Sequence, residues 1–187
     1  MKLTLEYGWD CTPDEFWALY FDEEFAVRLH LEALDSTSAD IVSQEGDLAT
    51  GLVRTLRYGQ RPPMPGPVRK IFGEEVVTTE VSTFDPATST TTFTMTPGTM
   101  ADKTQIEGSI GFAVDGGTTV ETFTLDARVK IFGAGPVVER FIERQARAMQ
   151  ERSVAFMRAF WPDVFVPAAL RRPLESSGLV IPRARRA

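Results

Sequence analysis

The stretch "GPVVERFIERQARAMQERSVAFMRAFWPD", Gly135 to Asp163, decides the fold expected for this chain. Pro136 suits the first turn of a helix, and Pro162 follows its end. One side of the expected helix carries, at helical spacing, Val138, Phe141, Ile142, Gln145, Met149, Phe156 and Phe160. A helix from Pro136 to Trp161 spans roughly 39 Å. It can therefore cross a whole domain and bury one face along a sheet.

Strand patterns fill most of the chain ahead of this helix. Residues 2–9 alternate, with Leu3, Leu5, Tyr7 and Trp9 on one face. Three hairpins follow, in residues 38–59, 74–97 and 103–133, with turns expected near Glu45–Asp47, at Asp85–Thr88 and at Asp115–Gly117. Together these segments predict an antiparallel sheet of about seven strands.

Two short helices are expected between the first strand and the first hairpin. Thr12-x-x-Glu15 matches a capping box, and Pro13 suits the first helical position. The second run, "DEEFAVRLHLEAL", directs Phe25, Leu29 and Leu34 toward a core. The predicted order is therefore strand, two helices, six strands and one long helix.

Three segments in this order carry a family resemblance: "TPDEFWALYFDEEF", "MPGPVRKIFGEEVVTTEVSTF" and "VKIFGAGPVVERFIERQ". With them the chain resembles the START-like (helix-grip, SRPBCC) superfamily, and within it an uncharacterised bacterial family. The resemblance implies an α+β fold in which a curved antiparallel sheet wraps around the C-terminal helix. We expect one such domain over residues 1–162, followed by a basic, flexible extension over residues 163–187.

The resemblance also implies an apolar ligand, such as a lipid, in a cavity between the sheet and the helix. Small or polar positions on apolar faces indicate an incomplete core at Thr104, Gly108, Ala127, Gln145 and Ser153. The ligand-binding residues expected are Tyr7, Trp9, Arg54, Phe93, Phe112, Phe123, Leu125, Phe141, Gln145 and Met149. The alternative is a solid core filled by the same aromatic and methionine side chains.

Charge and cysteine content limit the partners. The net charge is −6, and residues 1–50 hold twelve acids against two bases. Such an acidic body argues against a nucleic-acid surface. The basic extension either contacts an acidic partner or anionic lipid, or is simply solvated. With a single cysteine, no signal-peptide pattern and no membrane-spanning run, the expectation is a cytoplasmic protein without stable membrane insertion.

No catalytic, metal or cofactor motif appears in the sequence, so a non-enzymatic role is favoured. His30 is the only histidine, and we expect a surface or packing role for it; Cys11 is expected to be inert. The leading hypothesis is a carrier or sensor of a hydrophobic small molecule. One alternative is an enzyme of the polyketide cyclase or aromatase kind, with Tyr7, Arg54 and Arg57 as candidates. The other is a protein-interaction module that uses the acidic N-terminal third or the basic extension.

Overall fold

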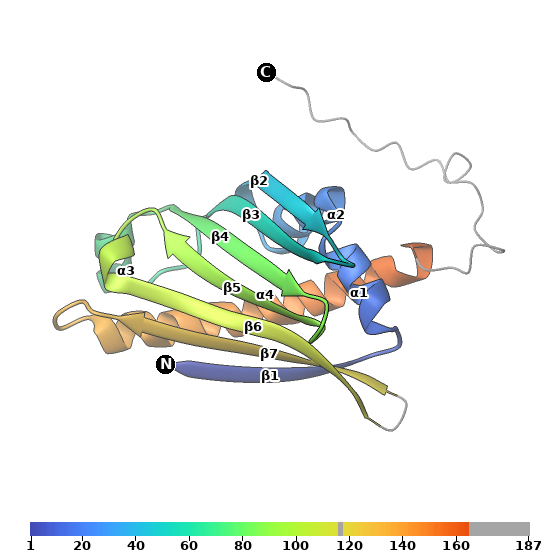
Figure 1. The fold of residues 1–187 in the computed structure, drawn as a ribbon. Helices are drawn as coiled ribbons and strands as arrows, with labels where there is room; N and C mark the ends of the chain where they lie inside the picture. Colours follow the sequence, from blue (N-terminus) through green and yellow to red (C-terminus); the bar gives the residue numbers. More distant parts are fainter. Residues whose placement is uncertain (116–117, 165–187) are drawn as a thin grey trace, which may run out of the picture.

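The computed structural model describes residues 1–115 and 118–164. Seven antiparallel strands form one curved sheet in the order β1-β7-β6-β5-β4-β3-β2 (Figure 1). The strands are β1 (Lys2–Trp9), β2 (Ser36–Asp47), β3 (Gly51–Gln60), β4 (Val76–Asp85), β5 (Thr90–Pro97), β6 (Thr104–Asp115) and β7 (Thr118–Val129). The chain thus has the predicted α+β helix-grip fold.

The three predicted hairpins are present, but the first turn was misplaced. β2 and β3 join through residues 48–50, after the expected Glu45–Asp47. The Asp47 carboxylate accepts hydrogen bonds from the backbone N–H groups of Ala49 (2.9 Å) and Thr50 (2.8 Å), which closes the turn there. The turn after Asp85 is confirmed, whereas residues 116–117 of the third turn lie outside the described residues.

Three helical segments lead from β1 to β2: α1 (Pro13–Tyr20), α2 (Glu23–Arg28) and the π-helical turn η1 (Leu29–Ala33). The predicted capping box is present, because Thr12 Oγ1 accepts from Glu15 N and Glu15 Oε2 accepts from Thr12 N (2.9 Å). Phe25 and Leu34 are buried as expected. The π turn widens the helix where it faces the domain interior.

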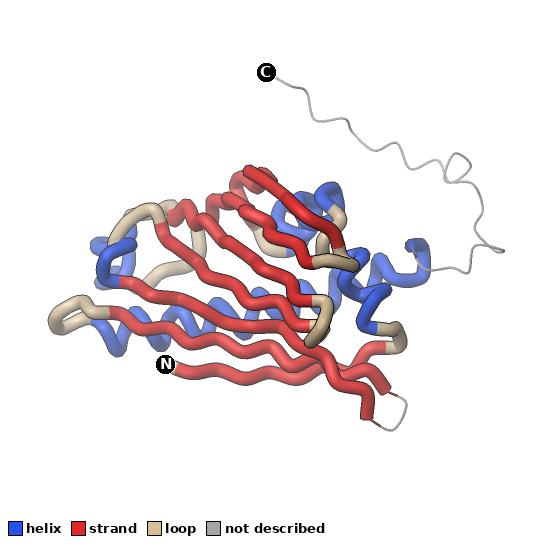
Figure 2. Tube along the Cα trace, viewed as in Figure 1, coloured by secondary structure: helices blue, strands red, loops and turns tan. Residues whose placement is uncertain are grey.

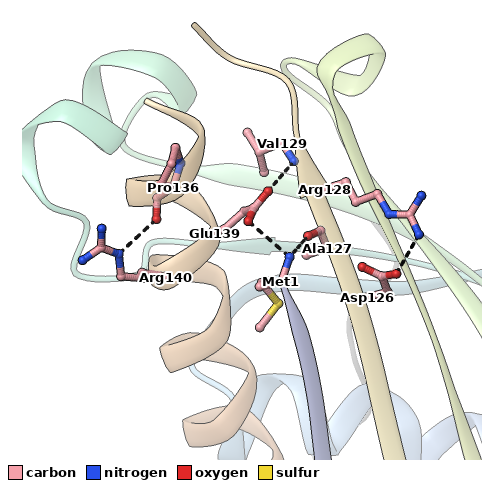
Figure 3. A network of polar contacts seen from close by, with 8 residues as sticks. All are labelled: Met1, Asp126, Ala127, Arg128, Val129, Pro136, Glu139 and Arg140. Carbon is pink, nitrogen blue, oxygen red and sulfur yellow. Dashed lines mark hydrogen bonds and ion pairs between the residues drawn. The ribbon is translucent and has the colours of Figure 1, made fainter. Parts of the chain in front are cut away.

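Helix α4 (Gly135–Val164) crosses the concave side of the sheet, as Figure 2 shows. Its first turn is attached to the sheet by one carboxylate, drawn in Figure 3. Glu139 accepts from Val129 N (3.0 Å) and pairs with the N-terminal ammonium of Met1 (3.2 Å), which also donates to Ala127 O. These contacts join the first strand, the last strand and the helix at one point.

A further short helix, α3 (Gly66–Phe72), covers the same end of the sheet. Val68 and Phe72 are buried on this helix. They pack with Met64, Val129 and Val138, so α3 bridges the end of β7 and the start of α4. None of the helices within residues 1–115 and 118–164 is long and apolar enough to span a bilayer.

At the opposite end, α1 closes the sheet with a cluster of rings. This aromatic cluster consists of Trp9, Phe16, Trp17, Phe21, Phe84 and Phe112. The ring centroids are 4.6 Å apart for Phe16 and Phe112 and 5.0 Å apart for Trp17 and Phe84. Edge-to-face and tilted pairs at these distances fill the space densely.

Candidate functional site

Between the sheet and α4 lies a cavity of about 230 Å³. Its wall is mostly apolar and draws on β3 to β7, α3, α4 and the segment from α1 to η1. Among the apolar side chains that border it are Leu56, Met64, Phe72, Ile106, Ile110, Ile142, Val154 and Met157. A mostly apolar cavity with a few polar groups is the usual form of a small-molecule site.

Seven of the ten predicted ligand-binding residues border this cavity: Arg54, Phe93, Phe123, Leu125, Phe141, Gln145 and Met149. The other three do not. Phe112 packs against Phe16 and Trp17 in the aromatic cluster. Trp9 is buried behind the cavity wall, and Tyr7 packs on the periphery of the same core. Ring packing therefore involves Phe112 and Trp9, while Tyr7 is only partly buried at the edge of the core.

Of the five positions that predicted an incomplete core, three border the cavity and two do not. Thr104, Gln145 and Ser153 border the cavity. Gly108 does not, because the ring of its cross-strand partner Phe93 covers it; an added Cβ would lie 2.5 Å from Phe93 Cζ. Ala127 is fully buried and likewise lies outside the cavity wall. A missing side chain on a strand can thus be filled by a neighbour and leave no void.

Arg54 is the principal polar group of the cavity. Its side chain is buried, and Nη1 donates to Tyr20 O (2.7 Å). The guanidinium lies 4.8 Å from the ring centroids of both Tyr20 and Phe21, which provides cation–π contact. Its Nε has no hydrogen-bond partner among the described residues. A buried donor without an acceptor is costly, and a ligand oxygen would satisfy it.

Further ionisable groups surround Arg54 inside the cavity. Glu80 is buried and accepts from Ser82 Oγ (2.8 Å); burial raises its pKa, although Arg54 opposes this. Burial also raises the pKa of Tyr20 and Tyr58. His30, expected on a surface or in packing, is buried against the Tyr58 ring, and burial followed by the charge of Arg54 lowers its pKa to about 4. At neutral pH this histidine is uncharged.

A second polar group, Glu121 on β7, borders the cavity beneath α4. Its carboxylate accepts from Trp9 Nε1 (2.7 Å) and Gln150 Nε2 (2.8 Å), which ties β1, β7 and α4 together. Burial raises its pKa to about 7, against the opposing effects of Trp9, Arg158 and Gln150. Glu121 is therefore partly protonated at neutral pH.

Sequence reasoning missed Glu80 and Glu121. For His30 it left a surface and a packing role open, and the structure shows packing. One signal was available: Glu121 shares the strand face of Phe123 and Leu125, both of which were assigned inward. For Glu80 the residue types on β4 mislead, because the apolar Val81 lies on the outer face and is more exposed than the charged Glu80 on the inner face. Arg57, offered as a catalytic candidate, is exposed on the outer face of β3.

The remaining candidates for reactivity or metal binding are Cys11 and clusters of possible metal ligands. Burial, followed by nearby Glu15 and Asp10, raises the pKa of the Cys11 thiol to about 12, so the thiol stays protonated at neutral pH. Within residues 1–115 and 118–164, no three histidine, cysteine, aspartate or glutamate side chains gather closely enough to hold a metal ion.

The family is identified by a match over most of the chain. A family model described as "Protein of unknown function (DUF2505)" matches residues 3–160. This chain belongs to the DUF2505 family. No curated protein matches it by sequence. The matched residues include all seven strands and most of α4, so the family definition coincides with the helix-grip domain.

Solved structures relate the DUF2505 fold to the START-like superfamily. The Zhui aromatase/cyclase from Streptomyces sp. R1128 has a TM-score of 0.62 and 14% identity, and the match covers 92% of this chain and 99% of that one. The protein TTHA0849 from Thermus thermophilus has a TM-score of 0.57, 18% identity and coverage of 83% and 98%. A START superfamily protein from Mycobacterium smegmatis has a TM-score of 0.54, 13% identity and coverage of 81% and 92%. At these identities the likeness shows the fold.

Proposed function

We propose that this chain binds and carries a hydrophobic small molecule in the cavity between the sheet and α4. The ligand has an apolar body and an oxygen atom that accepts a hydrogen bond from Arg54. The unpartnered Nε of Arg54 at the wall of an apolar cavity carries this proposal. Its guanidinium is held in place by Tyr20 O and two rings.

A second residue with an unpartnered polar atom also borders the cavity. Thr104 Oγ1 on β6 is buried and has no hydrogen-bond partner among the described residues. β4 and β5 separate β6 from β3, and the register places Arg54 level with Gly108, four residues from Thr104, so Thr104 and Arg54 lie roughly 20 Å apart along the diagonal of the sheet. A ligand that carries polar atoms near both ends of an apolar body would satisfy both groups.

Native mass spectrometry of the purified protein, followed by solvent extraction, tests this proposal. We expect a co-purifying apolar compound, or saturable binding of an apolar fluorescent dye. Arg54→Gln should weaken binding of an oxygen-bearing ligand about tenfold or more, since a charged hydrogen bond is lost. Arg57→Gln is the matched control, because Arg57 lies three residues further on β3 and is exposed on the outer face. A protein with neither bound compound nor dye binding would overturn the proposal.

One observation favours a second candidate, an enzyme of the aromatase/cyclase kind. Arg54, Glu80 and two tyrosines are buried together in the cavity, which is where general acids and bases with shifted pKa values are found. The similar fold of the Zhui aromatase/cyclase agrees with this candidate. Of the three catalytic candidates predicted from sequence, only Arg54 lies in this group.

Turnover separates the two candidates. Linear β-ketothioesters incubated with the wild-type chain should yield a cyclic product if the cavity is catalytic, and Glu80→Gln should reduce the rate more than the affinity. Binding of such compounds without any product would exclude this chemistry and leave the carrier proposal in place.

A further inference from the structure

The connection between β7 and α4 carries an apolar side chain that the fold leaves in solvent. Phe132 is fully exposed, whereas the next most exposed large apolar side chain among the described residues, Val42, is 61% exposed. Gly133, with a φ of 72°, follows it and turns the chain toward α4. A single exposed apolar residue is common on protein surfaces, so Phe132 becomes informative only through the charged side chains around it.

Basic side chains surround this turn. Lys130 precedes Phe132, Arg140 lies on the first turns of α4, and Lys103 lies beside the turn because Lys130 N donates to Lys103 O (2.8 Å). Arg69 and Lys70 lie on α3, whose buried residues pack with Ile131 and Val138. We call Phe132 and these five bases the Phe132 surface. Figure 1 shows α3 and the β7–α4 connection at the same end of the domain.

The bases of the Phe132 surface have no acidic partner among the described residues, although Arg69 and Arg140 donate to the backbone carbonyls of Met64 and Pro136. Within residues 1–115 and 118–164 none of its five bases forms an ion pair, and all five are exposed. Among the described residues, the exposed acids beside them that lack an ion pair are Asp102 and Glu74, because Glu75 pairs with Arg61. Five bases against two acids leave a net charge of +3 in this region, although the whole chain has a net charge of −6. The surface therefore differs in sign from the protein that carries it.

We propose that the Phe132 surface docks the protein onto an anionic lipid bilayer, with the Phe132 ring inserted between lipids. Each lysine or arginine near an anionic membrane contributes roughly 1 kcal/mol. Aromatic rings are favoured at the membrane interface, and long basic side chains keep their charge among the headgroups. One inserted ring and a few bases give weak, reversible association without insertion of a helix.

Two features favour lipid over another macromolecule. A specific protein interface buries about 800 Å² per partner around a central apolar cluster, whereas this surface has one protruding ring. A nucleic acid would engage the bases but would leave the ring without an apolar environment, since backbone recognition is electrostatic. At the surface of an anionic bilayer, the basic side chains can contact the headgroups while the Phe132 ring is inserted between the lipids.

The position of the surface relates it to the cavity. Phe72 of α3 and Val138 and Phe141 of α4 border the cavity, and they also belong to the apolar cluster that supports the Phe132 surface. A docked domain would thus hold this end of its cavity beside the bilayer. The docking proposal does not depend on the cavity being occupied, so the two proposals fail separately.

Vesicle co-sedimentation of the full chain tests docking, with phosphatidylcholine vesicles compared with phosphatidylcholine–phosphatidylglycerol vesicles. We expect binding only to the anionic vesicles, and loss of binding as salt is raised. Phe132→Ala and Lys130→Glu should each weaken it about tenfold. Val42→Ala and Arg57→Glu are the matched controls, because both residues are exposed elsewhere on the sheet, and they should leave it unchanged.

A Phe132→Trp variant reports insertion directly. Its fluorescence, after subtraction of the wild-type spectrum, should shift to the blue on addition of anionic vesicles and be quenched by brominated lipids. Binding that is equal for wild type, Phe132→Ala and Lys130→Glu would overturn the proposal, because another part of the chain would then be responsible. So would the absence of any binding to anionic vesicles at low salt, or capture of nucleic acid by the same bases without a fluorescence shift.

Discussion

Two regions of the interior, one beneath α1 and one beneath α4, are built from the same residue types, but the first is densely packed and the second encloses a cavity. Beneath α1 the aromatic cluster packs ring against ring, with centroids 4.6–5.3 Å apart for Phe16, Trp17 and Phe112. Beneath the middle of α4 the helix presents Gln145, Ala146 and Ser153 to the sheet, and a cavity of about 230 Å³ remains. Side-chain length on the covering helix, rather than the sheet itself, separates packed core from cavity.

The largest expected effect compares two phenylalanines, one from each region. Phe84 is buried in the aromatic cluster, and Phe123 is similarly buried but borders the cavity. Phe84→Ala should reduce the free energy of unfolding by about 3–5 kcal/mol. Phe123→Ala should cost about 1 kcal/mol less, because its ring already lacks contacts on one side. Equal losses in urea unfolding curves would show that the interior beneath α4 is packed as tightly as the cluster.

Glu121, which borders the cavity and accepts from Trp9 of the aromatic cluster, should make the stability of the fold depend on pH. Its pKa is about 7 in the folded chain and near 4.5 when unfolded, so the folded state retains a proton that the unfolded state releases. The free energy of unfolding therefore falls as pH rises from about 4.5 through 7, by up to about 3 kcal/mol from this group.

Glu121→Gln removes this contribution. The difference in free energy of unfolding between variant and wild type should change with pH in the variant's favour between pH 4.5 and 7. The difference is used because the contribution of His30 is the same in both proteins and cancels. The pKa of His30 is about 4 in the folded chain, so His30 acts oppositely to Glu121 and lowers the free energy of unfolding as pH falls from about 6.5 through 4. A difference independent of pH would mean that Glu121 is solvated and charged throughout.

Two alanines sharpen the contrast in packing. Ala127 is fully buried away from the cavity, and Ala146 borders it. Ala127→Leu should cost about 1–3 kcal/mol through overpacking. Ala146→Leu should leave the melting temperature nearly unchanged while it reduces apolar dye binding, since the added methyl groups occupy existing space. A large loss for Ala146→Leu would indicate that the cavity closes in solution.

The smallest expected effects concern the polar anchors of the two covering helices. Thr12→Ala removes the cap of α1 and should cost about 1 kcal/mol at any ionic strength. Glu139→Gln weakens the attachment of α4 to Met1 and Val129 and should cost less than about 1 kcal/mol, with part of the loss disappearing at high salt. Thermal unfolding at low and high salt distinguishes the two substitutions. If the stability lost in Glu139→Gln does not depend on salt, the ion pair of Glu139 contributes nothing.

The fold could be predicted because its signals are local. The alternation of residues 2–9, the capping box at Thr12 and the apolar stripe from Val138 to Phe160 each depend on neighbours within a few residues. These patterns specify strand, helix and order, and the order of elements restricts the topology to a few possibilities. The resemblance to START-like proteins then selected one of them, which the structure has.

The site was only partly predictable, because it depends on which distant side chains meet. Alternation placed Phe93, Phe123 and Phe112 alike on inward faces, but α1 fills the space beside Phe112 and leaves that beside the other two open. It also could not reveal Glu80 as buried, since a sequence shows that a strand has two faces without showing how closely each is covered. Local periodicity therefore determined the elements of this protein, while the long-range packing of α1 and α4 on the sheet decided where its cavity and its buried charges lie.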